Sequence, residues 1–121
     1  LTRVLEWDKT GEQLQQLLVQ NGIPQIAFIV SREYQLSGAL SFYLPHQPWP
    51  HSIEKPERNL WSPLDEVKIG PSIFVCELQE CQGGVVDSYE RFEMPLRYLG
   101  EIETRRYDRM VRNLQVYELI P

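Results

Sequence analysis

A run of five apolar residues, Ile26–Val30, constrains the fold of this chain more than any other feature of its sequence. Three of the five are β-branched and no polar residue interrupts them, so the run predicts a strand that is buried on both faces. Strands of this kind belong to sheets against which helices pack. A second run, Ser72–Leu78, predicts another strand of the same sheet.

The segment before the first strand is predicted to be a helix over Gly11–Gln20. Thr10 followed by Gln13 is a capping-box pattern, which marks the start of this helix. Gly22 marks its end, because glycine is the common residue just past a helix C-terminus. The apolar stripe of the helix consists of Leu14, Leu17 and Leu18.

After the first strand, a second amphipathic helix is predicted, and Ser31 is its expected cap. Its apolar residues recur at helical spacing and are Leu36, Ala39, Leu40 and Tyr43. Pro45 forces Leu44 out of helical geometry and ends the helix. The proline-rich stretch that follows is expected to be extended, with a short strand at Trp49–Ile53, and then to form an irregular surface loop anchored by Trp61.

The end of the chain predicts a different arrangement. A turn is expected at residues 79–84 and a short helix at 85–94. Residues 96–105 and 110–119 alternate between polar and apolar, which favours an antiparallel hairpin joined at Arg106–Arg109. The predicted fold class is therefore α/β: a small mixed sheet with helices packed on it, a βαβ start and a C-terminal antiparallel hairpin.

Length and charge limit the possible classes. The 121 residues predict a single domain, and the net charge of −5 argues against a nucleic-acid partner, which favours a basic surface. No apolar run reaches the roughly 18 residues of a membrane span, and no signal-peptide pattern is present. Because the chain begins at Leu1 instead of Met, we expect it to be a piece of a longer protein.

The residues that could carry catalysis or bind a metal are few. His46 and His51 lie in the proline-rich segment without a flanking cysteine, an HExxH helix or a GxSxG motif, and they are interpreted as plain loop residues. Gly83 and Gly84 lack the GxGxxG pattern and the Walker lysine, and they predict a turn instead of a phosphate cradle. No catalytic residue, metal ligand or cofactor is therefore predicted.

Two further side-chain groups have competing interpretations. Cys76 and Cys81 do not have the spacing of a zinc site and are interpreted as free thiols, with a local disulfide in an oxidising compartment as the alternative. Glu101 and Glu103 share one strand face and could form a catalytic carboxylate pair. Arg105 lies on the same face, which favours a solvated, salt-bridged surface.

Basic and aromatic residues are the candidates for binding. The one basic cluster consists of Arg105, Arg106, Arg109 and Arg112. This cluster could contact anionic lipid headgroups or a phosphate-bearing partner, or it could simply be the charged tip of a hairpin. The aromatic residues Tyr34, Tyr43, Trp49 and Trp61 could stack on sugars or anchor a partner, or they could serve core packing.

The stretch from Arg32 to Pro48, preceded by its strand, resembles a segment near the C-terminus of bacterial membrane glycosyltransferases of family 39, the dolichyl-phosphate-mannose-protein mannosyltransferase-like proteins. The matching residues are Tyr34, Gln35, Leu36, Leu40, Phe42, Tyr43, Leu44 and Pro45. His46 stands where the family commonly has glycine.

Other motifs of that family occur in the same order along nearly the whole chain. Trp7 and Asp8 resemble the lead-in of the family, and Leu60 and Trp61 resemble a short Tyr-Asp-Leu-Trp motif in which Asn59 replaces the acid. Residues 69–77 resemble a Gly-x-x-Ala-Leu-Phe-Val strand, and residues 99–119 resemble the closing hairpin. Each motif is short, so the ordered set is what supports the resemblance.

The resemblance implies a parent activity and a location. The family transfers a sugar from a polyprenyl-phosphate-linked donor to an acceptor outside the cytoplasm, and its catalytic acids lie in a membrane part that has no counterpart here. No catalytic residue therefore transfers to this chain. The chain is expected to be a periplasmic C-terminal accessory domain whose partners are the membrane part of the same protein and its donor or acceptor. The alternatives are a stand-alone soluble binding module, or a small doubly wound enzyme without a recognised motif at its strand ends.

Overall fold

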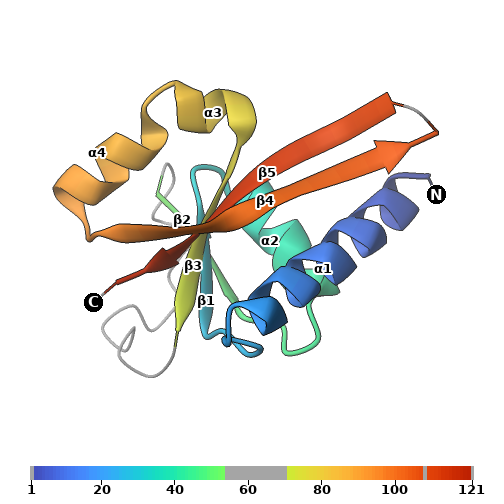
Figure 1. Cartoon of the computed structure of the whole chain (residues 1–121), viewed down its shortest axis with the longest axis horizontal. Coiled ribbons are helices and arrows are strands. Elements are labelled where there is room, and N and C mark those ends of the chain that lie inside the picture. The colour runs from blue at the N-terminus through green and yellow to red at the C-terminus, as the bar shows by residue number, and fades with distance from the viewer. Residues whose placement is uncertain (1, 54–70, 108, 121) are drawn as a thin grey trace.

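The computed structural model describes residues 2–53, 71–107 and 109–120. Its elements follow in the order α1 (Thr2–Gln20), β1 (Phe28–Ser31), α2 (Tyr34–Tyr43), β2 (Trp49–Ser52), β3 (Ser72–Glu77), α3 (Leu78–Gln82), α4 (Val85–Phe92), β4 (Leu96–Arg106) and β5 (Arg109–Leu119). The strands form one sheet in the order β2-β1-β3-β5-β4 (Figure 1). β1 pairs in parallel with β2 and β3, whereas β5 is antiparallel to both β3 and β4. The predicted α/β class, its βαβ start and its terminal hairpin are confirmed.

Helices cover both faces of the sheet, and β3 contributes to the core on each side. Ile73 and Val75 pack under α1 and α2, together with Leu14 and Leu40. Phe74 and Cys76 pack on the opposite face, where α3 and α4 lie. The prediction that the apolar runs are strands buried on both faces is confirmed.

The first helix begins nine residues before its predicted start, because Thr10 is not a cap. Its hydroxyl donates a hydrogen bond to the Glu6 carbonyl oxygen over 2.8 Å and lies 2.6 Å from the Thr104 hydroxyl on β4. A threonine that bonds the carbonyl four residues earlier stands inside a helix. The capping-box interpretation of Thr10 was therefore wrong, and the apolar stripe with Leu14 and Leu18 fully buried is confirmed.

The second helix ends as predicted but begins differently. Leu44 has extended backbone angles and its N–H donates to the Leu40 carbonyl oxygen, so the helix stops immediately before Pro45. The N-cap is Glu33 instead of Ser31. Ser31 remains part of β1, where its hydroxyl accepts a hydrogen bond from the Ser37 N–H over 3.1 Å. The strand therefore satisfies a donor in the first turn of the helix.

The segment after β3 corrects two predictions. The expected turn at 79–84 is largely the helix α3, which a capping box between Glu77 and Glu80 opens. Cys76 and Cys81 are disulfide-bonded, so the interpretation as free thiols was wrong. The physical reason is that the helix folds back at the strand end and brings the two Cα atoms to 5.8 Å, within the usual range for a disulfide.

The predicted terminal hairpin is confirmed, and residues 114–118 of β5 join it to β3. The pairing between β3 and β5 ends at Glu77 and Leu114. Beyond that point β4 and β5 continue as a two-stranded ribbon (Figure 1). The ladder is shifted at Tyr98/Gly100 and again at Thr104/Arg105, so the hairpin contains two irregularities of the kind that twist a ribbon.

Replacing Leu40 by Ala is expected to lower the free energy of unfolding by about 2–5 kcal/mol, because it leaves a cavity at a fully buried site of α2. Phe42 lies on the same helix and is 65% exposed. Its replacement by Ala is expected to change stability by no more than about 0.5 kcal/mol. Urea denaturation of both variants checks the pair, and equal losses would contradict this packing of α2.

The Tyr89 hydroxyl is expected to ionise only at an abnormally high pH. Burial, and then the charge of Glu93, raise the pKa of Tyr89 to about 12. Because this folded-state pKa lies above the usual unfolded value, Tyr89 contributes stability below pH 10 that is lost as the pH rises towards 12. The loss is about 2 kcal/mol for this residue. The free energy of unfolding, measured at pH 9 and at pH 12, should show this loss in the unmodified chain and not in Tyr89→Phe. Equal losses in the two proteins would contradict the raised pKa of Tyr89.

Candidate functional site

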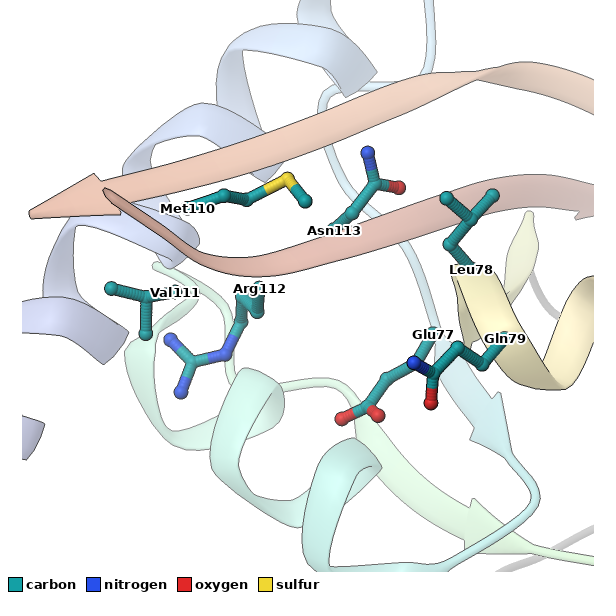
Figure 2. Close-up of a pocket in the computed structure, with 7 residues that line it drawn as sticks. All are labelled: Glu77, Leu78, Gln79, Met110, Val111, Arg112 and Asn113. Atoms are coloured by element: carbon teal, nitrogen blue, oxygen red, sulfur yellow. The ribbon is translucent and has the colours of Figure 1, made fainter. Parts of the chain in front are cut away.

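One edge of the sheet brings together the carboxyl ends of the parallel strands and the tip of the hairpin. β1, β2 and β3 all end at this edge, and β4 runs in the same direction because it pairs with β5. In open α/β sheets this is the edge at which ligands bind. A pocket of about 230 Å³ opens where β3 stops and β5 continues (Figure 2). It is lined by Glu77, Leu78, Gln79, Met110, Val111, Arg112 and Asn113.

Arg112 connects this pocket to the helix α1. Its guanidinium lies 3.8 Å from the centre of the Trp7 ring and donates a hydrogen bond to the Thr10 hydroxyl over 3.2 Å. Burial lowers the pKa of Arg112, while the carboxylates of Glu6 and Glu77 act in the opposite direction. The guanidinium remains a cation, because arginine is not deprotonated in proteins. Arg112 and Glu77 point to the same side of β5 (Figure 2).

These contacts join three elements. Because the Thr10 hydroxyl has one proton and donates it to the Glu6 carbonyl, the Thr104 hydroxyl must act as the donor between the two threonines. Thr10 then accepts from both Thr104 and Arg112. The cluster therefore fixes α1 to β4 and β5, and it leaves Arg112 little freedom to reach a ligand.

The other side of the hairpin carries a second polar cluster, centred on Gln115. The Tyr98 hydroxyl donates to the side-chain oxygen of Gln115 over 2.7 Å. The Gln115 amide nitrogen in turn donates to Asn113 over 2.6 Å and to Glu101 over 3.2 Å. Asn113 also donates to the same Glu101 oxygen over 3.2 Å. Glu101 is thus an acceptor in a structural network, and the idea that it pairs with Glu103 as a catalytic carboxylate has no support.

The tip of the hairpin is an exposed mixture of apolar and basic side chains. We use the name hairpin tip for Arg105, Arg106, Tyr107, Arg109, Met110 and Val111. Tyr107 is 88% exposed, Met110 50% and Val111 37%. The sequence predicts a charged turn for these residues. The structure adds that they lie beyond the end of β3, where Tyr107 and Met110 are exposed.

The four predicted arginines do not converge on one point. Arg105 pairs with Glu103 at 3.1 Å, which confirms the predicted salt bridge on that strand face. Arg106 lies 3.7 Å from Glu6, and Arg109 is exposed without an ion pair to any residue that the structure describes. Arg112 is turned towards α1, as described above. Three of the four therefore belong to the hairpin tip, and the fourth is a packing residue.

The residues of the family resemblance are distributed along the fold instead of forming one site. Tyr34 begins α2, and Tyr43 and Pro45 lie at its other end, about 15 Å away for a helix of ten residues. Gln35 is exposed on the first turn of α2. Trp7 packs on the core beneath α1, next to Arg112. Trp61, with the loop it was expected to anchor, lies outside the described residues.

Tyr43 has an additional packing role. Its Cβ and carbonyl oxygen lie where a side chain on Gly11 would stand, and a Cβ built there would be only 2.9 Å from both atoms. Glycine is therefore required for α1 to approach α2 this closely. Tyr43 therefore has a role in helix packing.

A larger pocket of about 670 Å³ lies at the same sheet edge, between α3, α4 and the end of β2. Arg32 reaches into it but forms ion pairs with Glu80 and Glu33. Gly83 and Gly84 line it as the link between α3 and α4, in agreement with the predicted turn. Within the described ranges, no group of three or more His, Cys, Asp or Glu side chains could hold a metal ion.

Comparisons with protein-family models, with curated proteins and with solved structures find no match for this chain. Among the helices that the structure describes, none is long and apolar enough to cross a membrane.

Replacing Arg112 by Met is expected to lower the free energy of unfolding by about 2 kcal/mol, since it removes the stacking on Trp7 and a hydrogen bond from a charged donor. The matched control is Arg109→Met at the exposed tip, expected to change stability by no more than about 0.5 kcal/mol. Urea denaturation followed by tryptophan fluorescence measures both. Equal effects would mean that Arg112 is not a packing residue.

Proposed function

We propose that this chain is an extracytoplasmic accessory domain of an integral-membrane glycosyltransferase, similar to the family 39 enzymes that use polyprenyl-phosphate-linked sugars. The observation that carries the proposal is the disulfide between Cys76 and Cys81. Disulfides persist in oxidising compartments such as the periplasm and are rare in the cytosol. The bond therefore supports the location that the ordered sequence motifs imply.

The placement of the motif residues also supports this proposal. Tyr34 to Pro45 build α2 and its exit, the elements that connect β1 to β2 and position the N-terminal half of the sheet. A structural role of this kind would explain why related domains share the segment although none of its residues is catalytic. The resemblance is therefore consistent with a shared fold, and the activity is assigned to the membrane part.

The role we assign to the domain itself is recognition and positioning. The polar clusters around Arg112 and Gln115 are hydrogen-bonded internally, which supports a structural role for them. The hairpin tip presents exposed side chains at the same sheet edge, Tyr107 and Met110 among them. In this proposal the tip and the pocket next to it face the membrane part, the lipid-linked donor or the acceptor.

The location can be tested in the cells that produce the complete protein. The full-length product is labelled with a maleimide after denaturation, with and without reductant, and intact spheroplasts are treated with protease. We expect Cys76 and Cys81 to react only after reduction, and we expect the domain to be cleaved from outside. A cytosolic protein with a free thiol is the control. Free thiols together with protection from protease would overturn the proposal and favour a cytosolic binding module.

The parent activity needs a separate experiment. Membranes that contain the full-length product are assayed for sugar transfer from a polyprenyl-phosphate donor, in parallel with the purified 121-residue chain. We expect transfer by the membranes and none by the chain alone. Transfer by the isolated chain would mean that the domain is itself an enzyme, and the assignment as an accessory domain would be wrong.

A further inference from the structure

The hairpin tip differs from the other exposed surfaces in its shape. β3 stops pairing with β5 at Leu114, so the tip extends from the sheet as a ribbon of only two strands. Figure 1 shows this ribbon projecting away from α3 and α4, towards the end of the molecule where α1 begins. Its end presents Tyr107 and Met110 to solvent. A narrow protrusion with apolar side chains at its end can insert these side chains into an apolar environment.

The tip also differs in charge from the rest of the chain. Residues 105–111 contain three arginines and one aspartate and therefore carry a net charge of +2. Since the whole chain carries −5, the other 114 residues carry −7. Near an anionic surface this asymmetry orients the molecule with the tip towards the surface and the remainder away from it.

We propose that the hairpin tip docks onto the surface of an anionic lipid bilayer. Tyr107 and Met110 enter the headgroup region, where the amphipathic ring of a tyrosine is favoured. Arg105, Arg106 and Arg109 contact the lipid phosphates, and each cation near an anionic surface adds to the attraction. The ion pair of Arg105 with Glu103 is on the surface, and exchanging such a pair for phosphate contacts costs little. Arg106 lies 3.7 Å from Glu6, whose side chain is only 16% exposed, and its own side chain is 44% exposed.

A bilayer fits the tip better than a protein partner does. A specific protein interface takes about 20–30 residues from each side, whereas the tip offers six. Insertion into a lipid interface needs only a few apolar side chains next to cations. The binding is therefore weak for the free chain, and it orients a domain that is already tethered to the membrane. Only the tether to the membrane rests on the proposed function; the docking of the tip does not.

Sedimentation of the purified chain with vesicles tests the docking. Vesicles of phosphatidylglycerol and phosphatidylcholine are compared with vesicles of phosphatidylcholine alone. We expect binding to the anionic vesicles that decreases as salt is added, because exposed charges are screened. Arg109→Glu should weaken this binding about 30-fold, because one attractive cation is lost and a repelled anion is gained. The matched control is Arg91→Glu, the same charge change at an exposed position of α4.

Insertion is tested separately from electrostatic adsorption. The Tyr107→Trp variant should show additional fluorescence quenching by brominated lipids compared with the unmodified chain. Tyr107→Ser and Met110→Ser, tested as separate variants, should each weaken binding to the vesicles. Val19→Ser, at an exposed apolar position of α1, should not. Equal effects of the tip variants and their controls, or no binding to anionic vesicles at low salt, would overturn the docking. These outcomes do not depend on the thiol and protease results, so the two proposals fail independently.

Discussion

The rest of the structure depends on burial of β3 on both faces. Ile73 and Val75 on one side, and Phe74 and Cys76 on the other, are completely inaccessible to solvent. A strand that is apolar on both faces is stable only if a second layer covers each side. This requirement explains why α1 and α2 lie on one face and α3 and α4 on the other. It also places β3 in the middle, where it joins the parallel strands to the antiparallel hairpin.

The hairpin is longer than the strand that supports it, and this mismatch creates the candidate site. β3 ends at Glu77, where the chain turns into α3 and is fixed by the disulfide of Cys76 and Cys81. β5 continues beyond that point, so a pocket forms beside it and Tyr107 and Met110 of the tip remain exposed. Arg112 and Thr10 hold the ribbon onto α1 from the other side. The ribbon is therefore supported as far as these contacts and exposed at its tip, as a docking element requires.

Much of this arrangement is readable from local sequence patterns. The apolar runs predicted β1 and β3, the helical spacing of Leu36 and Leu40 predicted α2, and the proline after Leu44 predicted its end. The hairpin followed from alternation in two adjacent segments. Among the local patterns that misled, Thr10 has the sequence of a cap but bonds to β4, and the segment after Cys76 has the composition of a turn but forms a helix. In both cases a contact with another element outweighed the local preference.

The sequence by itself determined the fold class and the order of its elements, because burial on one face or on two faces imposes a periodicity that each segment carries alone. Only the tertiary structure decided how the functional candidates are used. The arginines 105, 106, 109 and 112 look equivalent in the sequence, yet Arg112 is fixed against Trp7 while Arg109 is exposed at the tip. That difference depends on where β3 ends relative to β5 and on the ladder irregularity at Thr104 and Arg105. Strand register is set by pairing between segments distant in the chain, so no single segment encodes it.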